Sequence, residues 1–201
     1  GAGKTTTVEI LEGYRTRDAG EVLVCGIDPA RADRAWRDRI GIVLQSSRPS
    51  DESTVRELVA EFAGYFRRPR DIDEVIEAVG LTPQAGQRAK RLSGGQQRRL
   101  DVALGIVGSP EVLFLDEPTT GFDPDARRQF WALIADLRRQ GTTILLTTHY
   151  LEEAEALADR VTVVADGRTV ADAAPSRLGG RDQAPATVAW TEDGIRRSTA
   201  T

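Results

Sequence analysis

The chain opens on a glycine-rich stretch that is typical of phosphate binding, Gly1-Ala2-Gly3-Lys4-Thr5-Thr6. Phosphate-binding loops need little side-chain bulk, because their backbone N–H groups and the N-terminus of the following helix point at the anion. A lysine then reaches the β- and γ-phosphates and a hydroxyl binds Mg²⁺, and Lys4 and Thr5 have these side chains in the required order. The full motif carries another glycine upstream, so an ordinary glycine-rich helix start is the alternative interpretation.

A pair of acids follows a continuous apolar run. Asp116 and Glu117 come directly after residues 112–115, Val-Leu-Phe-Leu. Such a run is typical of a central parallel strand, and ligands bind at the carboxyl ends of strands in open α/β sheets. Asp116 has the chemistry to hold Mg²⁺, and Glu117 that to deprotonate an attacking water. The alternative, two exposed loop acids, is weakened by the phosphate-binding loop in the same chain.

Residues 92–96, Leu-Ser-Gly-Gly-Gln, indicate a second anion-binding helix start. Ser93 and Gln96 form a capping box, and Gly94 and Gly95 leave backbone N–H groups accessible at the positive end of the helix dipole. One ATP does not need two such sites in one chain, whereas a dimer does if each site closes on the partner's nucleotide. An ordinary capped helix is the alternative.

Two further polar residues follow predicted strands. His149, the single histidine, comes just after the strand predicted at 143–147, at the edge of the sheet where Asp116 lies. This position favours contact with a γ-phosphate over the structural role that a lone histidine usually has. Gln45 ends the strand predicted at 40–44 and has the reach for Mg²⁺ or water, with a plain polar strand end as an equal alternative.

The elements that position these residues alternate between strand and helix, which predicts a parallel-sheet α/β core. From about Pro49 to Ser109 the pattern is helical alone, which predicts an inserted helical segment. Strands are expected at residues 21–25, 40–44, 112–115, 143–147, 161–164, 168–170 and 186–190, the last followed by a fraying tail. Helices are expected at 5–11, 54–66, 71–79, 93–107 and 151–158, and between Asp123-Pro124 and Gly141, with a solvated amphipathic helix at 31–39. Asp166-Gly167 is a strong hairpin turn signal.

The composition is that of a folded, ordinary globular chain. It has 201 residues, 40% of them hydrophobic, with a net charge of −4, which gives no overall attraction to nucleic acid. One cysteine, Cys25, excludes an intramolecular disulfide, and no apolar run reaches the roughly 18 residues of a membrane span. Methionine is absent and the chain begins inside a motif. We therefore expect a fragment that lacks the strand before the phosphate-binding loop and half of that loop.

These motifs, in this order, resemble the nucleotide-binding domain of ATP-binding cassette (ABC) transporters over about residues 1–170. Residues 1–6 resemble the Walker A motif, Gln45 the Q-loop, residues 92–96 the LSGGQ signature, and residues 112–117 the Walker B motif with its catalytic glutamate. Residues 121–123, Gly-Phe-Asp, resemble the D-loop, with phenylalanine where leucine is usual, and His149 the H-switch. The stretches TTGFDPDAR and TTHYLEEAEALADRV look most like the daunorubicin-resistance-type ATPases that pair with ABC-2 permeases.

The resemblance implies a P-loop NTPase fold: a parallel-sheet core with an inserted helical subdomain and some antiparallel strands. The ATPase domain would span 1–174, with core segments 1–48 and 110–174 and a helical subdomain at 49–109, and 175–201 would begin a C-terminal extension. The residues that it implies for nucleotide binding are Gly1, Ala2, Gly3, Lys4, Thr5, Thr6, Gln45, Ser93, Gly94, Gly95, Gln96, Asp116 and Asp123. Thr5, Gln45 and Asp116 would bind Mg²⁺, and Glu117 and His149 would act in hydrolysis.

The resemblance also implies how such a chain works. Two copies, or this chain and a close relative, would close head to tail around two Mg-ATP molecules and drive export through a separate membrane permease. The chain would lie peripherally on the cytoplasmic face of the membrane, with no nucleic acid as partner. The aromatic residue that stacks on adenine in the family is missing, so ATP rather than GTP is implied by the resemblance alone.

Three other interpretations are compatible with an ABC-type ATPase. A DNA-acting ATPase of the SMC or Rad50 group needs a long coiled coil, and the span from Gln45 to Leu92 is short and lacks sustained heptads. An ABC-F translation factor needs tandem cassettes and a basic linker, and this sequence contains neither. A regulatory cassette without activity has no chemical need for Lys4, Glu117 and His149 together.

Overall fold

The computed structural model describes residues 2–43, 52–180, 187–192 and 195–200. The helices are α1 (Lys4–Leu11), α2 (Arg34–Arg37), α3 (Val55–Ala63), α4 (Ile72–Ala78), α5 (Gly94–Ile106), α6 (Pro124–Arg139) and α7 (Leu151–Leu157). The strands are β1 (Ile40–Val43), β2 (Val112–Asp116), β3 (Thr143–Thr147), β4 (Val161–Ala165), β5 (Arg168–Ala173), β6 (Thr187–Glu192) and β7 (Ile195–Ala200). Short 3₁₀ turns lie at Pro29–Arg31, Thr82–Gln84, Ala89–Arg91 and Pro175–Gly180.

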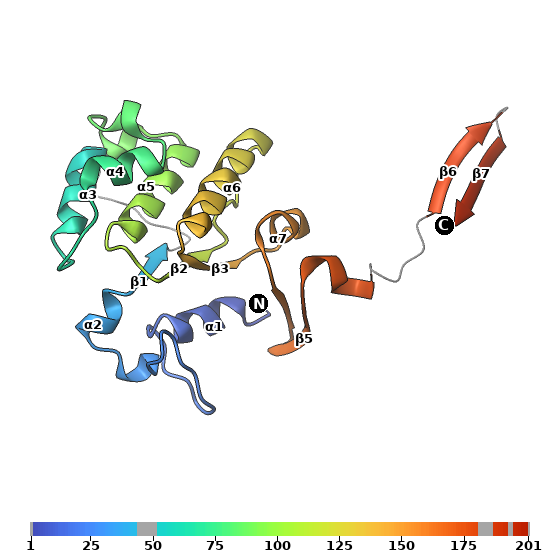
Figure 1. Cartoon of the computed structure of the whole chain (residues 1–201), viewed down its shortest axis with the longest axis horizontal. Helices are drawn as coiled ribbons and strands as arrows, with labels where there is room; N and C mark the ends of the chain where they lie inside the picture. The colour runs from blue at the N-terminus through green and yellow to red at the C-terminus, as the bar shows by residue number, and fades with distance from the viewer. Residues whose placement is uncertain (1, 44–51, 181–186, 193–194, 201) are drawn as a thin grey trace.

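Three strands form a parallel sheet in the order β1-β2-β3, with helices on both faces (Figure 1). The central strand β2 is buried on both sides, as its apolar run predicted. Leu113 and Leu115 pack with the helices of the inserted segment and α6, while Phe114 between them packs on the opposite face with Val8 of α1. This strict alternation follows from the two-residue period of a strand and makes a three-layer α/β/α core.

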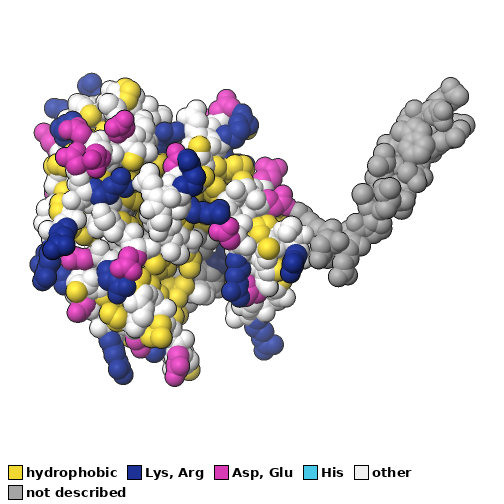
Figure 2. Space-filling view, in the orientation of Figure 1, with side chains coloured by type: hydrophobic (Ala, Val, Ile, Leu, Met, Phe, Trp, Pro, Cys, Tyr) yellow, Lys and Arg dark blue, Asp and Glu magenta, His cyan; other side chains and the backbone are white. Residues whose placement is uncertain are grey.

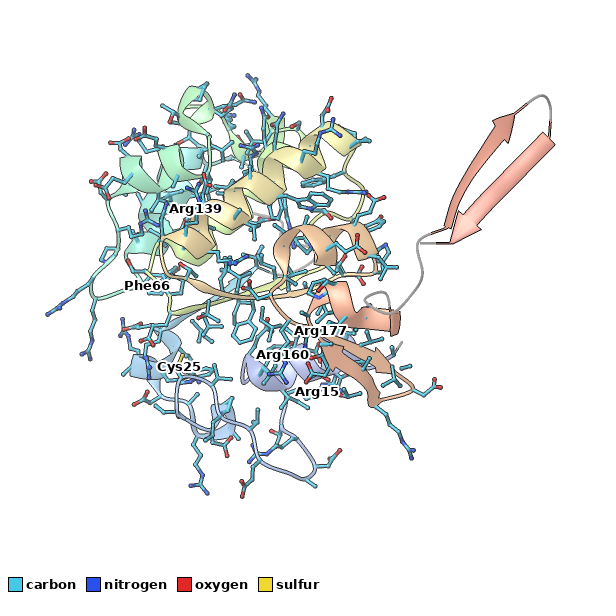
Figure 3. The ribbon with its side chains drawn as sticks, turned by 45° about the vertical axis from the view of Figure 1, so that its right-hand side comes forward. Arg15, Cys25, Phe66, Arg139, Arg160 and Arg177 are labelled. Atoms are coloured by element: carbon cyan, nitrogen blue, oxygen red, sulfur yellow. The ribbon has the colours of Figure 1, made fainter. Side chains whose placement is uncertain are left out.

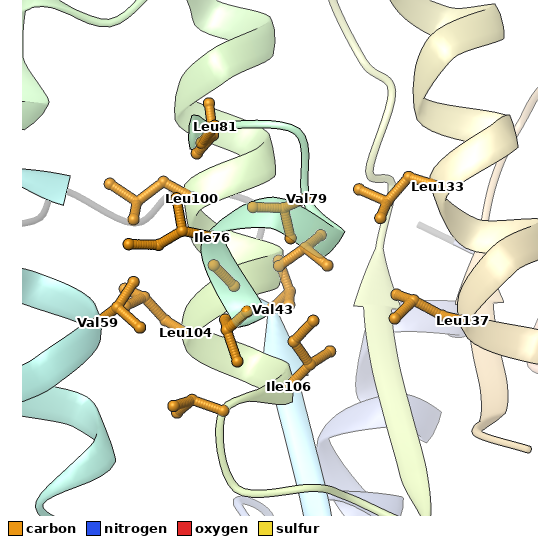
Figure 4. Packing of buried hydrophobic residues seen from close by; sticks show 14 of the residues in the cluster. Val43, Val59, Ile76, Val79, Leu81, Leu100, Leu104, Ile106, Leu133 and Leu137 are labelled. Carbon is orange, nitrogen blue, oxygen red and sulfur yellow. The ribbon is translucent and has the colours of Figure 1, made fainter. Parts of the chain in front are cut away.

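The larger core joins the helical segment to the sheet. Figure 4 shows Leu100 and Leu104 of α5 beside Val59 of α3, with Leu133 and Leu137 of α6 across from them. Capping boxes at Thr54 and Ser93 start α3 and α5, as predicted. The helix expected to reach Phe66 ends at Ala63, with Gly64 at the C-cap.

Helix α5 lies unusually close to β1. A Cβ built on Gly41 would lie 2.2 Å from the carbonyl oxygen of Gly105, and one built on Gly105 would lie 2.9 Å from Val43 Cγ2. Only hydrogen at these two positions allows the helix backbone to approach the strand this closely. Because Ser93 caps the same helix, the two glycines help to fix the position of residues 93–95 relative to the sheet.

Two expectations for the segment before β1 were wrong. Residues 21–25 do not form a strand, because no described strand lies beside them, and only an isolated bridge joins Val24 to Ile27 around a turn at Cys25 (Figure 3). The segment 31–39 is not one solvated helix, because Asp33 caps a separate turn, α2. Trp36 of α2 is buried against the sheet and donates from Nε1 to the Val24 carbonyl at 2.8 Å.

The predicted hairpin at Asp166-Gly167 is confirmed, with β4 antiparallel to β5. The fraying expected after Trp190 was wrong, because β6 pairs with β7 in a second antiparallel hairpin. The residues between these strands, Asp193-Gly194, are the same dipeptide that turns the first hairpin. No helix within the described parts of the chain is long and apolar enough to cross a bilayer.

Candidate functional site

The carboxyl ends of β2 and β3 bring the acids of the predicted site together. Asp116 pairs in register with Thr147, and the Thr147 hydroxyl donates to Asp116 Oδ1. The backbone N–H of Glu117 donates to both the carbonyl and the hydroxyl of Thr147, at 3.2 and 3.1 Å. Sequence reasoning missed Thr147, although its place at the end of the neighbouring strand was a sufficient signal.

Glu117 adopts a left-handed backbone conformation, with φ of 42°. A non-glycine residue in this region costs on the order of 1–3 kcal/mol and persists only where its surroundings hold it. The turn directs Glu117 away from the strand, and its side chain is 26% exposed. The Thr120 hydroxyl donates to Glu117 Oε2 at 3.4 Å. The carboxylate is thus accessible to a small reactant yet anchored at its backbone.

His149 lies beside this carboxylate. Its Nδ1 is 3.5 Å from Glu117 Oε2, and its ring lies against Tyr150 with centroids 4.1 Å apart. The guanidinium of Arg127 covers the Tyr150 ring at 4.3 Å. The predicted proximity of His149 to the acids is therefore confirmed in geometry.

The start of α1 meets the same edge of the sheet. Gly3 caps the helix with φ of 98°, a conformation that L side chains rarely adopt, and Lys4 Nζ donates to the Thr148 carbonyl at 3.4 Å. Ala2 accepts from the backbone N–H of Gly167 at 3.1 Å, so the hairpin of β4 and β5 supports the loop. Thr5 and Thr6 are exposed. The first N–H groups of a helix have no partner within it, so this helix start has the donors that a phosphate requires.

The oxygen ligands at this edge fit Mg²⁺. The Thr5 hydroxyl and the Asp116 carboxylate are hard donors, and Mg²⁺ ordinarily takes one or two protein ligands together with water and phosphate oxygens. In the described residues no group of three or more His, Cys, Asp or Glu side chains could hold a metal by itself.

The second predicted anion site forms a capped helix start. Ser93 Oγ accepts from the Gln96 N–H at 3.3 Å, and Gln96 Oε1 accepts from the Ser93 N–H at 2.9 Å, so the predicted capping box is confirmed. Ser93 and Gly94 are exposed. Because the Ser93 hydroxyl acts here as an acceptor, its own proton is available to an incoming anion.

A pocket of about 550 Å³ joins this helix start to the loop after β2. Ser93, Gly94 and Gly95 line one side, and Glu117 and Asp123 line the other. Within the described residues, the lining contains nothing from α1. The helix start at Ser93 therefore shares one pocket with Glu117 and Asp123.

Asp123 begins α6, as predicted. Its Oδ1 accepts from the N–H groups of Asp125 and Ala126 at 2.9 and 2.8 Å, and Pro124 takes the first helical position. Two other predicted site residues, Gly1 and Gln45, lie outside the described residues.

A buried acid lies near the site and was not predicted. Glu12 directly follows α1 and is 9% exposed. Burial, with the negative charges of Asp116 and Glu9 adding to it, raises the pKa of Glu12 from 4.5 to about 7. Sequence reasoning had no signal for this, since nothing near Glu12 in the chain indicates that the end of α1 faces β2.

Comparison with known families decides the identity of the fold. The profile described as "ABC transporter" matches residues 1–120, more than half of the chain. The chain belongs to the ABC transporter family. The resemblance to this family is thereby confirmed.

Two relatives within the ABC family show which of its members the chain is similar to. The Nod factor export ATP-binding protein I of Paraburkholderia xenovorans is 43% identical over 183 residues, covering 89% of this chain and 60% of that protein. A daunorubicin resistance ATP-binding protein of Streptomyces coeruleorubidus is 44% identical over 183 residues, covering 89% of this chain and 57% of that protein. The chain thus spans about three fifths of the length of these relatives, and both carry export or resistance in their names.

Solved ABC structures share the fold. The cbiO1 protein of Clostridium perfringens, described as part of an ABC transporter complex, has a TM-score of 0.81 at 26% identity, covering 90% of this chain and 76% of that one. A dimeric ATP-binding cassette in a post-hydrolysis state with ADP and phosphate has a TM-score of 0.75 at 23% identity, covering 87% and 81%. The fold is therefore that of the ABC-type P-loop ATPases, a mixed α/β architecture.

Proposed function

We propose that this chain is the ATP-binding and ATP-hydrolysing part of an ABC exporter. The observation that carries the proposal is the meeting of Lys4, Asp116, Glu117 and His149 at one edge of the sheet. These are the side chains that phosphate binding, metal binding and water activation require. The export-type names of the two relatives support the direction of transport.

Nucleotide binding follows from the start of α1. The backbone N–H groups after Ala2 and the ammonium of Lys4 hold the phosphate chain, and its negative charge is stabilised at the N-terminus of the helix. Thr5 and Asp116, together with Gln45, would hold Mg²⁺ through their oxygen atoms. When bound there, Mg²⁺ would supply positive charge to stabilise the phosphate oxygens.

Hydrolysis follows from Glu117. Its carboxylate accepts a proton from a water whose oxygen attacks the γ-phosphorus in line, while the bond to the bridging oxygen of the leaving ADP breaks. His149 lies beside the same carboxylate and would orient the water and the γ-phosphate. The left-handed turn at Glu117 and the contacts of Thr147 hold the carboxylate in position for this step.

The proposed assembly is a head-to-tail dimer. Each chain has two helix starts with the donors to bind an anion. A nucleotide between two chains would contact one helix start from each chain, on opposite sides. We propose that Ser93 and Gly95 of one protomer, supported by Gln96 and Gly94, close on the triphosphate held by the partner's Lys4, and that Asp123 contributes across the interface. A permease subunit would contact the segment 49–109 within the domain 1–174, at the cytoplasmic face of the membrane, with 175–201 as the start of an extension.

The substitution Lys4→Ala tests the proposal in the complete protein. A hydrogen bond to a charged group contributes about 1.5–3 kcal/mol, so the Kd for ATP should rise about 10-fold to 100-fold, as measured by fluorescence titration with a labelled nucleotide. Lys90→Ala is the matched control, because Lys90 pairs with Glu52 in the helical segment and should leave the Kd unchanged. An unchanged affinity for Lys4→Ala would show that the phosphate-binding assignment is wrong.

A further inference from the structure

A buried arginine holds the backbone on both sides of Glu117. Arg98, in the second turn of α5, is 7% exposed. Its Nη2 donates to the Asp116 carbonyl at 3.0 Å, and its Nε donates to the Pro118 carbonyl at 3.1 Å. One planar guanidinium therefore binds the residues immediately before and after the proposed general base.

The ion pair beside it gives the guanidinium a fixed orientation. Arg98 Nη1 lies 3.6 Å from Asp101 Oδ2, and both side chains are more than nine-tenths buried. A buried ion pair of this kind contributes little net stability compared with apolar side chains of similar volume. Its geometry is the more informative property, because a guanidinium presents its donors in a rigid planar fork.

Other contacts hold the loop beyond Glu117. The Thr119 hydroxyl and Trp131 Nε1 both donate to Oε1 of the fully buried Glu153, at 2.9 and 3.0 Å. These contacts fix a side chain two residues beyond Glu117. The contacts that Arg98 makes from α5 act on the peptide units before and after Glu117. These peptide units set the direction of the Glu117 side chain.

We propose that Arg98 is a positioning residue that holds the Glu117 carboxylate in its reactive direction and joins it to the helix that begins at Ser93. Thr147 holds the Glu117 N–H from β3, and Arg98 holds the flanking carbonyls from α5. Held from both sides, Glu117 keeps its unfavourable backbone conformation. This inference rests on the proposed ATP hydrolysis.

The position of Arg98 has a consequence for assembly. Arg98 and Asp101 line the same pocket as Ser93 and Gly94, so the donors for an incoming anion and the support of the base belong to one helix. Contact of the partner's nucleotide with the start of α5 would therefore reach, through Arg98, the backbone that flanks Glu117.

Steady-state ATP hydrolysis by the complete protein tests this role, with Arg98→Met and Arg98→Lys. Misplacement of a catalytic group by about 1 Å can cost about 100-fold in rate, so Arg98→Met should lower kcat by about 10-fold to 100-fold. KM and the Kd for ATP should stay within about twofold, because Arg98 donates to the carbonyls of Asp116 and Pro118 and is 7% exposed. Arg98→Lys, which keeps the charge and can reach one carbonyl, should recover part of the lost rate.

A double substitution separates positioning from a merely structural role. In a Glu117→Gln background the base is already absent, so adding Arg98→Met should change the residual rate by less than about twofold. Arg99→Met is the matched control: the neighbouring Arg99 donates to the Val79 carbonyl and to Gln129, away from the loop, at 3.1 and 3.0 Å. It should lower the melting temperature while leaving kcat unchanged.

The outcomes distinguish the two proposals. If wild-type hydrolysis is absent or does not depend on Glu117, the proposed function itself fails. If hydrolysis depends on Glu117 but neither Arg98 variant lowers kcat, the positioning role is overturned. It is also overturned if Arg98→Met lowers the rate of hydrolysis by the same factor with and without Glu117→Gln. If Arg98→Met does not fold, the kcat of Arg98→Lys decides in the same way.

Discussion

The Nδ1 of His149 lies 3.5 Å from Oε2 of Glu117, across the gap between the ends of two neighbouring parallel strands. Neither residue is close to the other in sequence, so the contact exists only because β2 and β3 are paired in register. A carboxylate and an imidazole at this spacing can share one water molecule and one phosphate oxygen between them.

Replacing the two residues should reveal their separate roles. Glu117→Gln should lower kcat by about 10²-fold to 10⁴-fold, the usual contribution of a general base, because the amide cannot accept the proton from water. The Kd for ATP should not change. His149→Ala should have a smaller effect on kcat, since it removes orientation while the base remains. A hydrolysis rate that survives Glu117→Gln intact is incompatible with the role proposed for that residue.

The two capping boxes offer a matched pair for the signature. Ser93→Ala and Thr54→Ala each remove a side-chain acceptor at a helix start and should each lower the free energy of unfolding by about 1 kcal/mol. Only Ser93→Ala should slow hydrolysis, by about tenfold, because its hydroxyl also binds the partner's phosphate. Urea denaturation and a phosphate-release assay measure the two effects. Equal activity of both variants would argue for an ordinary helix cap at Ser93.

Glu12 predicts how stability changes with pH. Its pKa is raised in the folded state from 4.5 to about 7, so the folded protein binds a proton there that the unfolded chain has already lost. The stabilising contribution is complete below about pH 4.5 and is lost as pH rises through 7. Between pH 6 and 8 the loss should be about 1 kcal/mol, measured by urea denaturation.

Glu12→Gln is the control for this effect. The amide has nearly the same shape and does not titrate, so the variant should lose less stability than the wild type between pH 6 and 8. It should also be the more stable protein at pH 8. Identical slopes for variant and wild type would assign the pH dependence to other groups.

Because α5 lies so close to β1, one added methyl group at Gly41 should strongly lower the free energy of unfolding. Gly41→Ala should lower the free energy of unfolding by about 2–3 kcal/mol, because the new Cβ meets the Gly105 carbonyl and that oxygen cannot move without the helix. Gly86→Ala, where nothing lies within 4 Å, should change stability by less than about 0.5 kcal/mol. Thermal melts of both variants check the difference, and a tolerated Gly41→Ala would contradict the packing described here.

Local signals in the sequence predicted the sheet and the helix starts. The apolar run before Asp116 identified the central strand, and the caps at Thr54, Ser93 and Asp123 identified the helices that follow them. These succeeded because each depends on residues within four positions of one another. The proximity of Asp116 and His149 was also predictable, since parallel strands end at the same edge of a sheet.

The features that the sequence did not predict depend on contacts between distant parts of the chain. Trp36 is buried in the apolar cluster and donates to the Val24 carbonyl, and the buried Arg98 donates to two carbonyls about twenty residues further along. An arginine in an exposed-looking helical pattern gives no local indication of either partner. The second hairpin was different: its Asp193-Gly194 turn signal was present in the sequence and was overlooked.

The face seen in Figure 2 carries basic and acidic side chains interspersed over the helical segment. Charged side chains of the helical segment form ion pairs, such as Arg88 and Lys90 with Glu52. Exposed pairs of this kind contribute about 0–1 kcal/mol each, so they are of minor importance to stability.

The central claim is that two protomers bind opposite sides of one triphosphate. The most direct measurement is the ATP turnover per molecule of the complete protein over a wide range of protein concentrations, with sedimentation under the same conditions. The account predicts that turnover per molecule rises with concentration and levels off as dimers form, and that Glu117→Gln with ATP sediments as a dimer. Constant turnover by a species that sediments as a monomer at every concentration would contradict it.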